Sequence, residues 1–224
     1  MTLWKVKLRL LMEMDSHSVN KEIKMKGSRT MSFIKTIMMG LLFSIASANA
    51  ADWVVDNQHS QLNFISIKKG NVAEVHQFNQ LQGKLDSQGQ FVLDIDLTSV
   101  DTHNAVRDER MTKHLFNVEQ FATAQLKANI ALSELDAIAQ GASKRLEIEA
   151  KLNLHGEEKT IKLNVMVTRL VGAKLSVVST QPVILTVGDY ALVSGVDKLM
   201  ELAKLPSISH AVPVSFYLTF NLKQ

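Results

Sequence analysis

Six histidines after residue 50 are the first side chains in this sequence to consider for metal or acid–base chemistry. None of the histidines after residue 50 has the H-x-x-x-H spacing that places two imidazoles on one helix face for zinc. The chain has no cysteine, which excludes thiolate metal ligands, cysteine nucleophiles and disulfides. We therefore expect no metal and no cofactor, and structural or solvent-facing roles for six residues: His59, His76, His103, His114, His155 and His210.

Motifs for nucleophilic catalysis are also absent from the sequence. There is no G-x-S-x-G elbow and no glycine-rich loop that could hold a phosphate. His59 and Ser60 are neighbours, and neighbours on a strand point to opposite faces, which argues against a base and nucleophile pair. Asp94 and Asp96 share the polar face of an expected strand, where solvent is their simplest environment. A non-enzymatic protein is favoured, with a lipid-modifying enzyme as the weaker alternative.

One cluster of charged residues permits two interpretations. Asp101, His103, Arg107, Asp108 and Arg110 lie close together in the sequence, on or beside an expected helix. Such charges commonly form local ion pairs that fix a helix to its surroundings. Alternatively, Arg107 or Arg110, with His103 nearby, binds a phosphate or another polar head group, for which a guanidinium is well shaped.

The elements that would position these residues are mostly strands, because apolar and polar residues alternate. Alternation is clearest in 212–222, where Pro213 would place the start of the strand at an edge or a bulge. Two further runs, 146–154 and 161–168, are joined by a polar turn. Weaker alternation indicates strands at 60–67, 76–86, 89–97, 124–132, 174–178 and 181–188.

About eight antiparallel strands in one domain favour a closed barrel, because closure leaves no unpaired strand edges. A β-sandwich is the alternative. Helical spacing over 103–116 and 195–204 predicts two short helices, and Ser194 with Asp197 resembles a capping box for the second. The fold class predicted is thus all-β, an antiparallel barrel with two short helices.

A barrel of this size has an interior that is either packed solid or holds one apolar ligand. The apolar faces of the expected strands give the candidate ligand-binding residues: Phe64, Phe91, Leu93, Ile95, Leu126, Ile130, Leu163, Val165, Phe216, Leu218 and Phe220.

The first fifty residues differ in character from the rest. A short basic start at Met31, the apolar run 37–46 and Ala48-Asn49-Ala50 form the three parts of a secretory signal peptide, with cleavage expected after Ala50. The apolar run is too short for a permanent membrane span, although an uncleaved anchor is the alternative. Residues 1–30 are interpreted as an upstream extension with a misassigned start. We expect an exported, periplasmic protein.

Charge follows the same division of the chain. Of the 25 basic and 22 acidic residues, residues 1–50 hold eight and three, so residues 51–224 carry a net charge of −2. The basic character belongs to the expected signal region. We therefore expect no nucleic-acid partner.

Three segments resemble the YceI-like family of periplasmic lipid- or polyisoprenoid-binding proteins. The stretch 97–116 (LTSVDTHNAVRDERMTKHLF) is similar to the family signature, Asp52-Trp53-Val-Val-Asp56 to its first strand, and 152–161 (LNLHGEEKTI) to its late hairpin. His76 departs from the family pattern, which tends to have glycine there. The resemblance implies a lipocalin-like barrel with a long apolar cavity, and an isoprenoid chain or a quinone as ligand. Residues 51–224 would form a single YceI-like β-barrel domain.

These expectations combine into one leading function and one alternative from another class. The leading interpretation is a periplasmic carrier that holds a polyisoprenoid, an isoprenoid quinone or another lipid inside the barrel. The alternative is a packed barrel that acts as a protein-interaction or envelope stress factor, with no internal cavity. The sequence leaves open whether the protein forms a homodimer.

Overall fold

The computed structural model describes residues 52–223. The predicted upstream extension and signal peptide lie outside these residues. Twelve strands make up most of the described chain: β1 (Asp52–Val55), β2 (Gln61–Lys68), β3 (Val72–Phe78), β4 (Leu81–Leu85), β5 (Gln90–Asp96), β6 (Val100–Asp101), β7 (Thr123–Asn129), β8 (Ser143–Leu154), β9 (Glu157–Leu170), β10 (Lys174–Ser179), β11 (Val183–Thr186) and β12 (Ala211–Lys223).

Eight of these strands form a closed antiparallel ring in the order β1, β4, β5, β7, β8, β9, β10 and β12. The ring closes where β12 pairs with β1, from Asp52 opposite Lys223 to Val55 opposite Phe220. The predicted barrel is confirmed, and the alternative sandwich is wrong because no edge of the ring is left open.

The remaining strands extend the barrel at one end, and β12 is the strand that joins the two parts. Its C-terminal half pairs with β1 and β10, whereas its N-terminal half pairs with β2 and β11. Pro213, which has no N–H to donate, pairs in register only with Ile184 of β11 and lies just beyond the ladder with β2. The expected strand 76–86 is divided between the end of β3 and β4.

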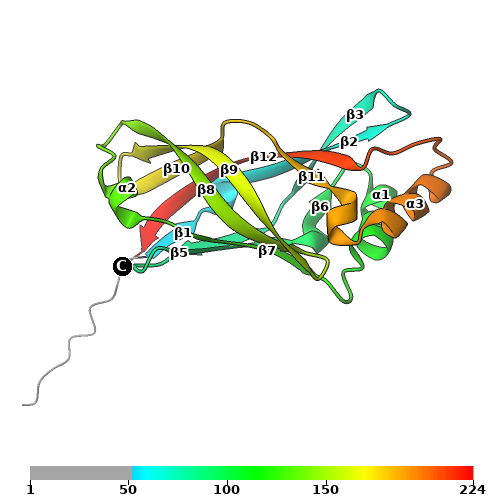
Figure 1. The fold of residues 1–224 in the computed structure, drawn as a ribbon, viewed down its shortest axis with the longest axis horizontal. Coiled ribbons are helices and arrows are strands. Elements are labelled where there is room, and N and C mark those ends of the chain that lie inside the picture. Colours follow the sequence, from blue (N-terminus) through cyan, green and yellow to red (C-terminus); the bar gives the residue numbers. More distant parts are fainter. Residues whose placement is uncertain (1–51, 224) are drawn as a thin grey trace, which may run out of the picture. The chain divides into compact units, whose positions relative to one another are not determined.

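Short helices connect and cover the strands. They are η1 (Asn57–His59), η2 (Leu97–Ser99), α1 (Ala105–Arg110), the π-helical turn η3 (Met111–Phe116), α2 (Leu132–Asp136), η4 (Val187–Tyr190) and α3 (Val193–Leu202). Figure 1 shows α1 and α3 together at the end of the strands where the β2–β3 hairpin projects, and α2 at the opposite end.

The two predicted helices exist, but their details differ from the prediction. The segment 103–116 is α1 followed by η3, and α1 is capped by Asn104, whose side chain accepts a hydrogen bond from the backbone N–H of Arg107. The capping box at Ser194 is wrong: α3 begins earlier, after Leu192, with no side-chain cap. The short helix α2 was not predicted.

Candidate ligand-binding cavity

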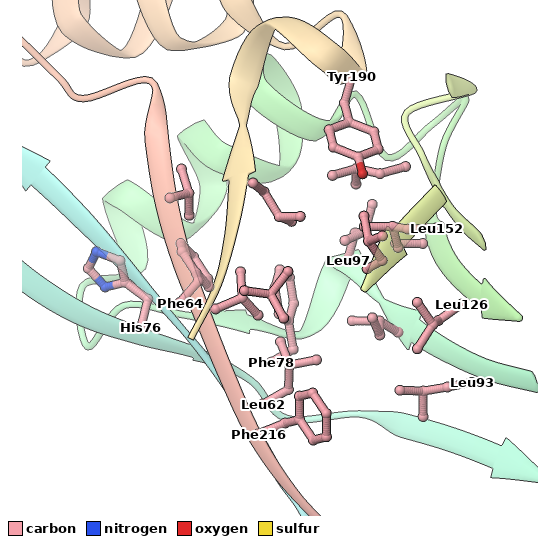
Figure 2. A pocket seen from close by; sticks show the side chains of 18 of the residues that line it. Leu62, Phe64, His76, Phe78, Leu93, Leu97, Leu126, Leu152, Tyr190 and Phe216 are labelled. Carbon is pink, nitrogen blue, oxygen red and sulfur yellow. The ribbon is translucent and has the colours of Figure 1, made fainter. Parts of the chain in front are cut away.

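The barrel encloses a cavity of about 610 Å³ whose walls are mostly leucine, isoleucine, valine and phenylalanine side chains (Figure 2). This volume lies within the roughly 300–1,000 Å³ typical of small-molecule sites. Every apolar residue that the strand alternation proposed as a ligand contact lines it: Phe64, Phe91, Leu93, Ile95, Leu126, Ile130, Leu163, Val165, Phe216, Leu218 and Phe220. Alternation identified them because side chains two residues apart on a strand point to the same side of the barrel wall.

A charged group forms part of the cavity rim where the β2–β3 hairpin meets α1. One carboxylate oxygen of Glu74 accepts a hydrogen bond from Arg107 Nη1 at 2.6 Å and lies 2.7 Å from Lys68 Nζ. The hydrogen bond from Lys68, together with the charges of Arg107 and Lys68, holds the pKa of Glu74 below its usual value, against the opposing effect of burial. The rim therefore carries an ionised carboxylate shared by two cations.

Arg107 is fixed by several partners at once. Besides Glu74, its Nε donates to Thr102 Oγ1 at 2.8 Å and its Nη2 to the Thr102 carbonyl at 2.7 Å. Asp108 accepts hydrogen bonds from the backbone N–H and the hydroxyl of the same Thr102. This geometry matches the first interpretation of the charged cluster, in which local pairs tie the helix to the barrel.

The other candidate head-group residues are placed differently. Arg110 lines the cavity, and within the described residues its side chain makes a single, long hydrogen bond, 3.4 Å from Nη1 to the Leu202 carbonyl. His103 is exposed, has a left-handed backbone with φ of 58°, and pairs with Asp101 at 3.5 Å instead of lining the cavity. The structure thus brings Arg107 and Arg110 to the cavity and leaves His103 outside it.

His76 and Ser66 are cavity-lining polar residues that sequence reasoning did not single out as a site. His76 is only 2% exposed, and its Nε2 lies 2.7 Å from Ser66 Oγ, while its Nδ1 is buried without a hydrogen-bond partner among the described residues. Its ring packs 5.1 Å from that of Phe64. Burial, with a smaller contribution from Arg107, lowers the pKa of His76, so the imidazole is neutral at pH 7.

A signal for these polar residues was present in the sequence. Ser66 and Lys68 continue the inward alternation of Phe64 along β2, and Glu74 stands two positions before His76 on β3. The same rule that found the apolar wall therefore places polar groups on the inward face at the end of the hairpin.

Three other residues whose side chains could take part in chemistry have structural roles. Asp94 accepts a hydrogen bond from Gln125, and Asp96 caps η2 through the backbone N–H of Thr98. His155, one of the six histidines expected in structural or solvent-facing roles, is half-buried: it turns the chain between β8 and β9 with φ of 55° and packs 4.4 Å from the ring of Phe121.

Two further observations concern residues 52–223 alone. No three histidine or acidic side chains in this part of the chain come together in a way that could hold a metal ion. No helix described there combines the length and the apolar character that crossing a bilayer requires.

A closed eight-stranded antiparallel barrel around an apolar cavity defines a lipocalin-like β-barrel protein. The model of the YceI-like domain family matches residues 53–220, so the chain belongs to that family.

Relatives and solved structures agree with this assignment. A UPF0312 protein of Vibrio cholerae is 27% identical over 143 residues, which cover 58% of this chain and 72% of the relative. The structure of a polyisoprenoid binding domain from Saccharophagus degradans, described as implicated in plant cell wall breakdown, is 34% identical, with a TM-score of 0.75, and the match covers 76% of this chain and 98% of that one. Burkholderia cenocepacia BcnA shares the fold at 20% identity and a TM-score of 0.57, over 74% of this chain and 98% of its own.

Proposed function

We propose that this protein is a non-enzymatic periplasmic binding protein that holds one long apolar ligand, such as a polyisoprenoid, an isoprenoid quinone or another lipid, inside its barrel. The observation that carries the proposal is the cavity itself, about 610 Å³ within walls of mostly apolar side chains. The similarity to a polyisoprenoid binding domain supports the same ligand class.

The energetics of burial favour such a ligand. Each methylene removed from water contributes about 0.8 kcal/mol, so about ten of them contribute about 8 kcal/mol before the loss of chain freedom is subtracted. The apolar walls offer few hydrogen-bond partners to a strongly polar molecule, whose desolvation would be unfavourable. A long hydrocarbon chain is therefore the part of a ligand that the apolar walls stabilise most.

The polar end of the ligand would lie at the rim. Arg107 has its donors engaged with Glu74 and Thr102, whereas the Arg110 side chain makes one long hydrogen bond within residues 52–223. We therefore assign contact with a polar head group to Arg110 first, with Arg107 orienting the rim and His103 playing no direct part.

Export to the periplasm is part of the proposal and depends on residues outside the described region. The basic start, apolar run and small-residue site of 31–50 support cleavage after Ala50. N-terminal sequencing of the protein from a periplasmic extract would test this directly, with a chain beginning at Ala51 as the expected result.

The alternative of a packed barrel does not fit the hollow interior. That interpretation predicts an interior filled by side chains, whereas the described barrel holds a cavity open to a ligand. A lipid-modifying enzyme would need a nucleophile, a base and a group that orients the base, and His76 lacks a partner on Nδ1 among the described residues.

Native mass spectrometry of protein purified from its host's envelope tests the proposal. The expected result is a bound mass of a few hundred daltons or more that is lost on denaturation. Phe216→Asp places a charge on the cavity wall and should abolish the bound mass, whereas Val178→Asp, at an exposed position of the neighbouring strand β10, should retain it. Protein that is empty in every preparation, or equal loading of both variants, would contradict the proposal.

A further inference from the structure

Tyr190 introduces a polar atom into the apolar part of the cavity. It is the last residue of η4, and the left-handed conformation of Ala191 (φ 53°) ends the helix immediately after it. The side chain is 2% exposed and lines the cavity. Figure 2 shows its ring entering the lined space with the hydroxyl oxygen directed toward Leu97 and Leu152, on a different side from His76.

The hydroxyl of Tyr190 makes no hydrogen bond within the described residues, and its oxygen remains accessible from the cavity, unlike the hydroxyl of the chain's other tyrosine. Tyr217, on the outer face, donates to Gln61 Oε1 at 2.7 Å. Burial raises the pKa of Tyr190, and the nearby charge of Asp189 raises it further. The Tyr190 hydroxyl therefore stays protonated and is available as a hydrogen-bond donor.

A tyrosine hydroxyl that faces an apolar cavity normally finds a hydrogen-bond partner, because an unmet donor in an apolar environment is costly. The leucine side chains in front of Tyr190 have no acceptor to offer. The partner must then come with whatever occupies the cavity. We infer that Tyr190 donates a hydrogen bond to an oxygen of the bound ligand, so that the natural ligand is an apolar molecule with a neutral acceptor such as a carbonyl or ether oxygen, and not a plain hydrocarbon. This inference rests on the proposed function.

The position of Tyr190 complements that of the rim cations. Arg107 and Arg110 can face a charged or strongly polar group that remains partly in water. Tyr190 lies against apolar walls, where an ionised phosphate would lose its hydration without a compensating positive charge. A neutral oxygen is the group that this environment accepts, and it would fix how far the ligand enters.

A matched pair of probes tests the inference. Phytone is a saturated isoprenoid methyl ketone, and norpristane is the isoprenoid alkane that differs from it only by the carbonyl oxygen. Their affinities for ligand-free protein are measured by displacement of the fluorescent probe N-phenylnaphthylamine. Tyr190→Phe removes only the oxygen, and Tyr217→Phe is the matched control, because it removes the other tyrosine hydroxyl from the outer surface.

We expect Tyr190→Phe to weaken phytone binding by about three- to tenfold, the effect of losing one neutral hydrogen bond, and to leave norpristane binding unchanged. Tyr217→Phe should alter neither affinity. The infrared carbonyl stretch of bound phytone should lie at a lower frequency in the wild type than in Tyr190→Phe, which reports the hydrogen bond independently of affinity. Circular dichroism confirms that the variants are folded.

The possible results distinguish the role of Tyr190 from the proposed function of the barrel. If both probes bind and Tyr190→Phe changes neither the phytone affinity nor the carbonyl frequency, the hydroxyl is satisfied by water and the inference is overturned, while the proposed function stands. If neither probe displaces the fluorophore from the wild type, both the inference and the proposed function are overturned.

Discussion

Gly195 lies where α3 packs against η3, and its replacement by alanine tests how closely these two helices pack at the end of the barrel. Gly195 is buried, and a Cβ added to it would lie 2.8 Å from the His114 carbonyl oxygen and 2.8 Å from Leu115 Cα. Two other residues of α3, Val196 and Leu199, line the cavity. The close approach at Gly195 therefore holds part of the cavity wall in place.

The two effects of Gly195→Ala oppose each other. Alanine is the better helix former by about 1 kcal/mol, so helix propensity alone predicts a more stable protein. Overpacking typically costs about 1–3 kcal/mol, and the upper half of that range applies because the contacted atoms belong to the backbone and cannot rotate away. The expected net loss is about 1–2 kcal/mol, which lowers the Tm of a domain of this size by about 2–8 °C.

Thermal and urea unfolding followed by circular dichroism measure this loss. Ser194→Ala is the matched control, since Ser194 is the exposed neighbour on the same helix and makes no cap. Ser194→Ala should leave the free energy of unfolding unchanged or raise it slightly. A Gly195→Ala protein as stable as the wild type or more stable would refute the close packing of α3 on η3.

His76→Asn should make the free energy of unfolding less dependent on pH below about 6.5. The pKa of His76 in the folded protein is lowered below 6.5, so the wild type takes up a proton when it unfolds. Its free energy of unfolding therefore falls by up to about 1.4 kcal/mol per pH unit as pH falls below about 6.5. Thermal melts of both proteins between about pH 5 and 7 check this, and parallel profiles would contradict it. Arg107→Ala should cost about 1–2 kcal/mol in urea unfolding, because several partners lose their donor, whereas Arg110→Ala should cost under about 0.5 kcal/mol; equal effects would argue against the fixed rim. Gly83→Ala should lower the free energy of unfolding, since its Cβ would lie 2.6 Å from Val55 Cγ2. In the double mutant, Val55→Ala should relieve part of this clash, so the combined loss should be smaller than the sum of the two single losses. Losses that simply add would show that the two side chains do not touch.

The barrel and its apolar wall were predictable because both depend on a local rule. Strand alternation determines which residues point inward whatever the rest of the chain does, so Phe216, Leu218 and Phe220 could be assigned to the interior from their spacing in β12. The number of long strands then required closure. The breaks that divide these strands, such as the 3-10 turn at 57–59, were not predictable from alternation alone.

The rim was less predictable because its contacts join segments far apart in the sequence. Glu74 and Arg107 are 33 residues apart, and nothing in the spacing of the charged cluster indicated that the partner of Arg107 would come from β3. Tyr190 lies in a short 3-10 turn with no periodic pattern, so only the packing of η4 over the barrel reveals that its hydroxyl faces the cavity. Such contacts are set by the tertiary fold and not by local preference.

The contents of the barrel are the most direct test of the central claim. Crystals grown from protein taken straight from its host, without any delipidating step, would show what occupies the cavity. We predict continuous, elongated electron density along the apolar walls between Leu126 and Phe216, with one end near the rim at Arg110. An interior that contains only water, or one filled by the protein's own side chains, would contradict the claim that this barrel binds an apolar ligand.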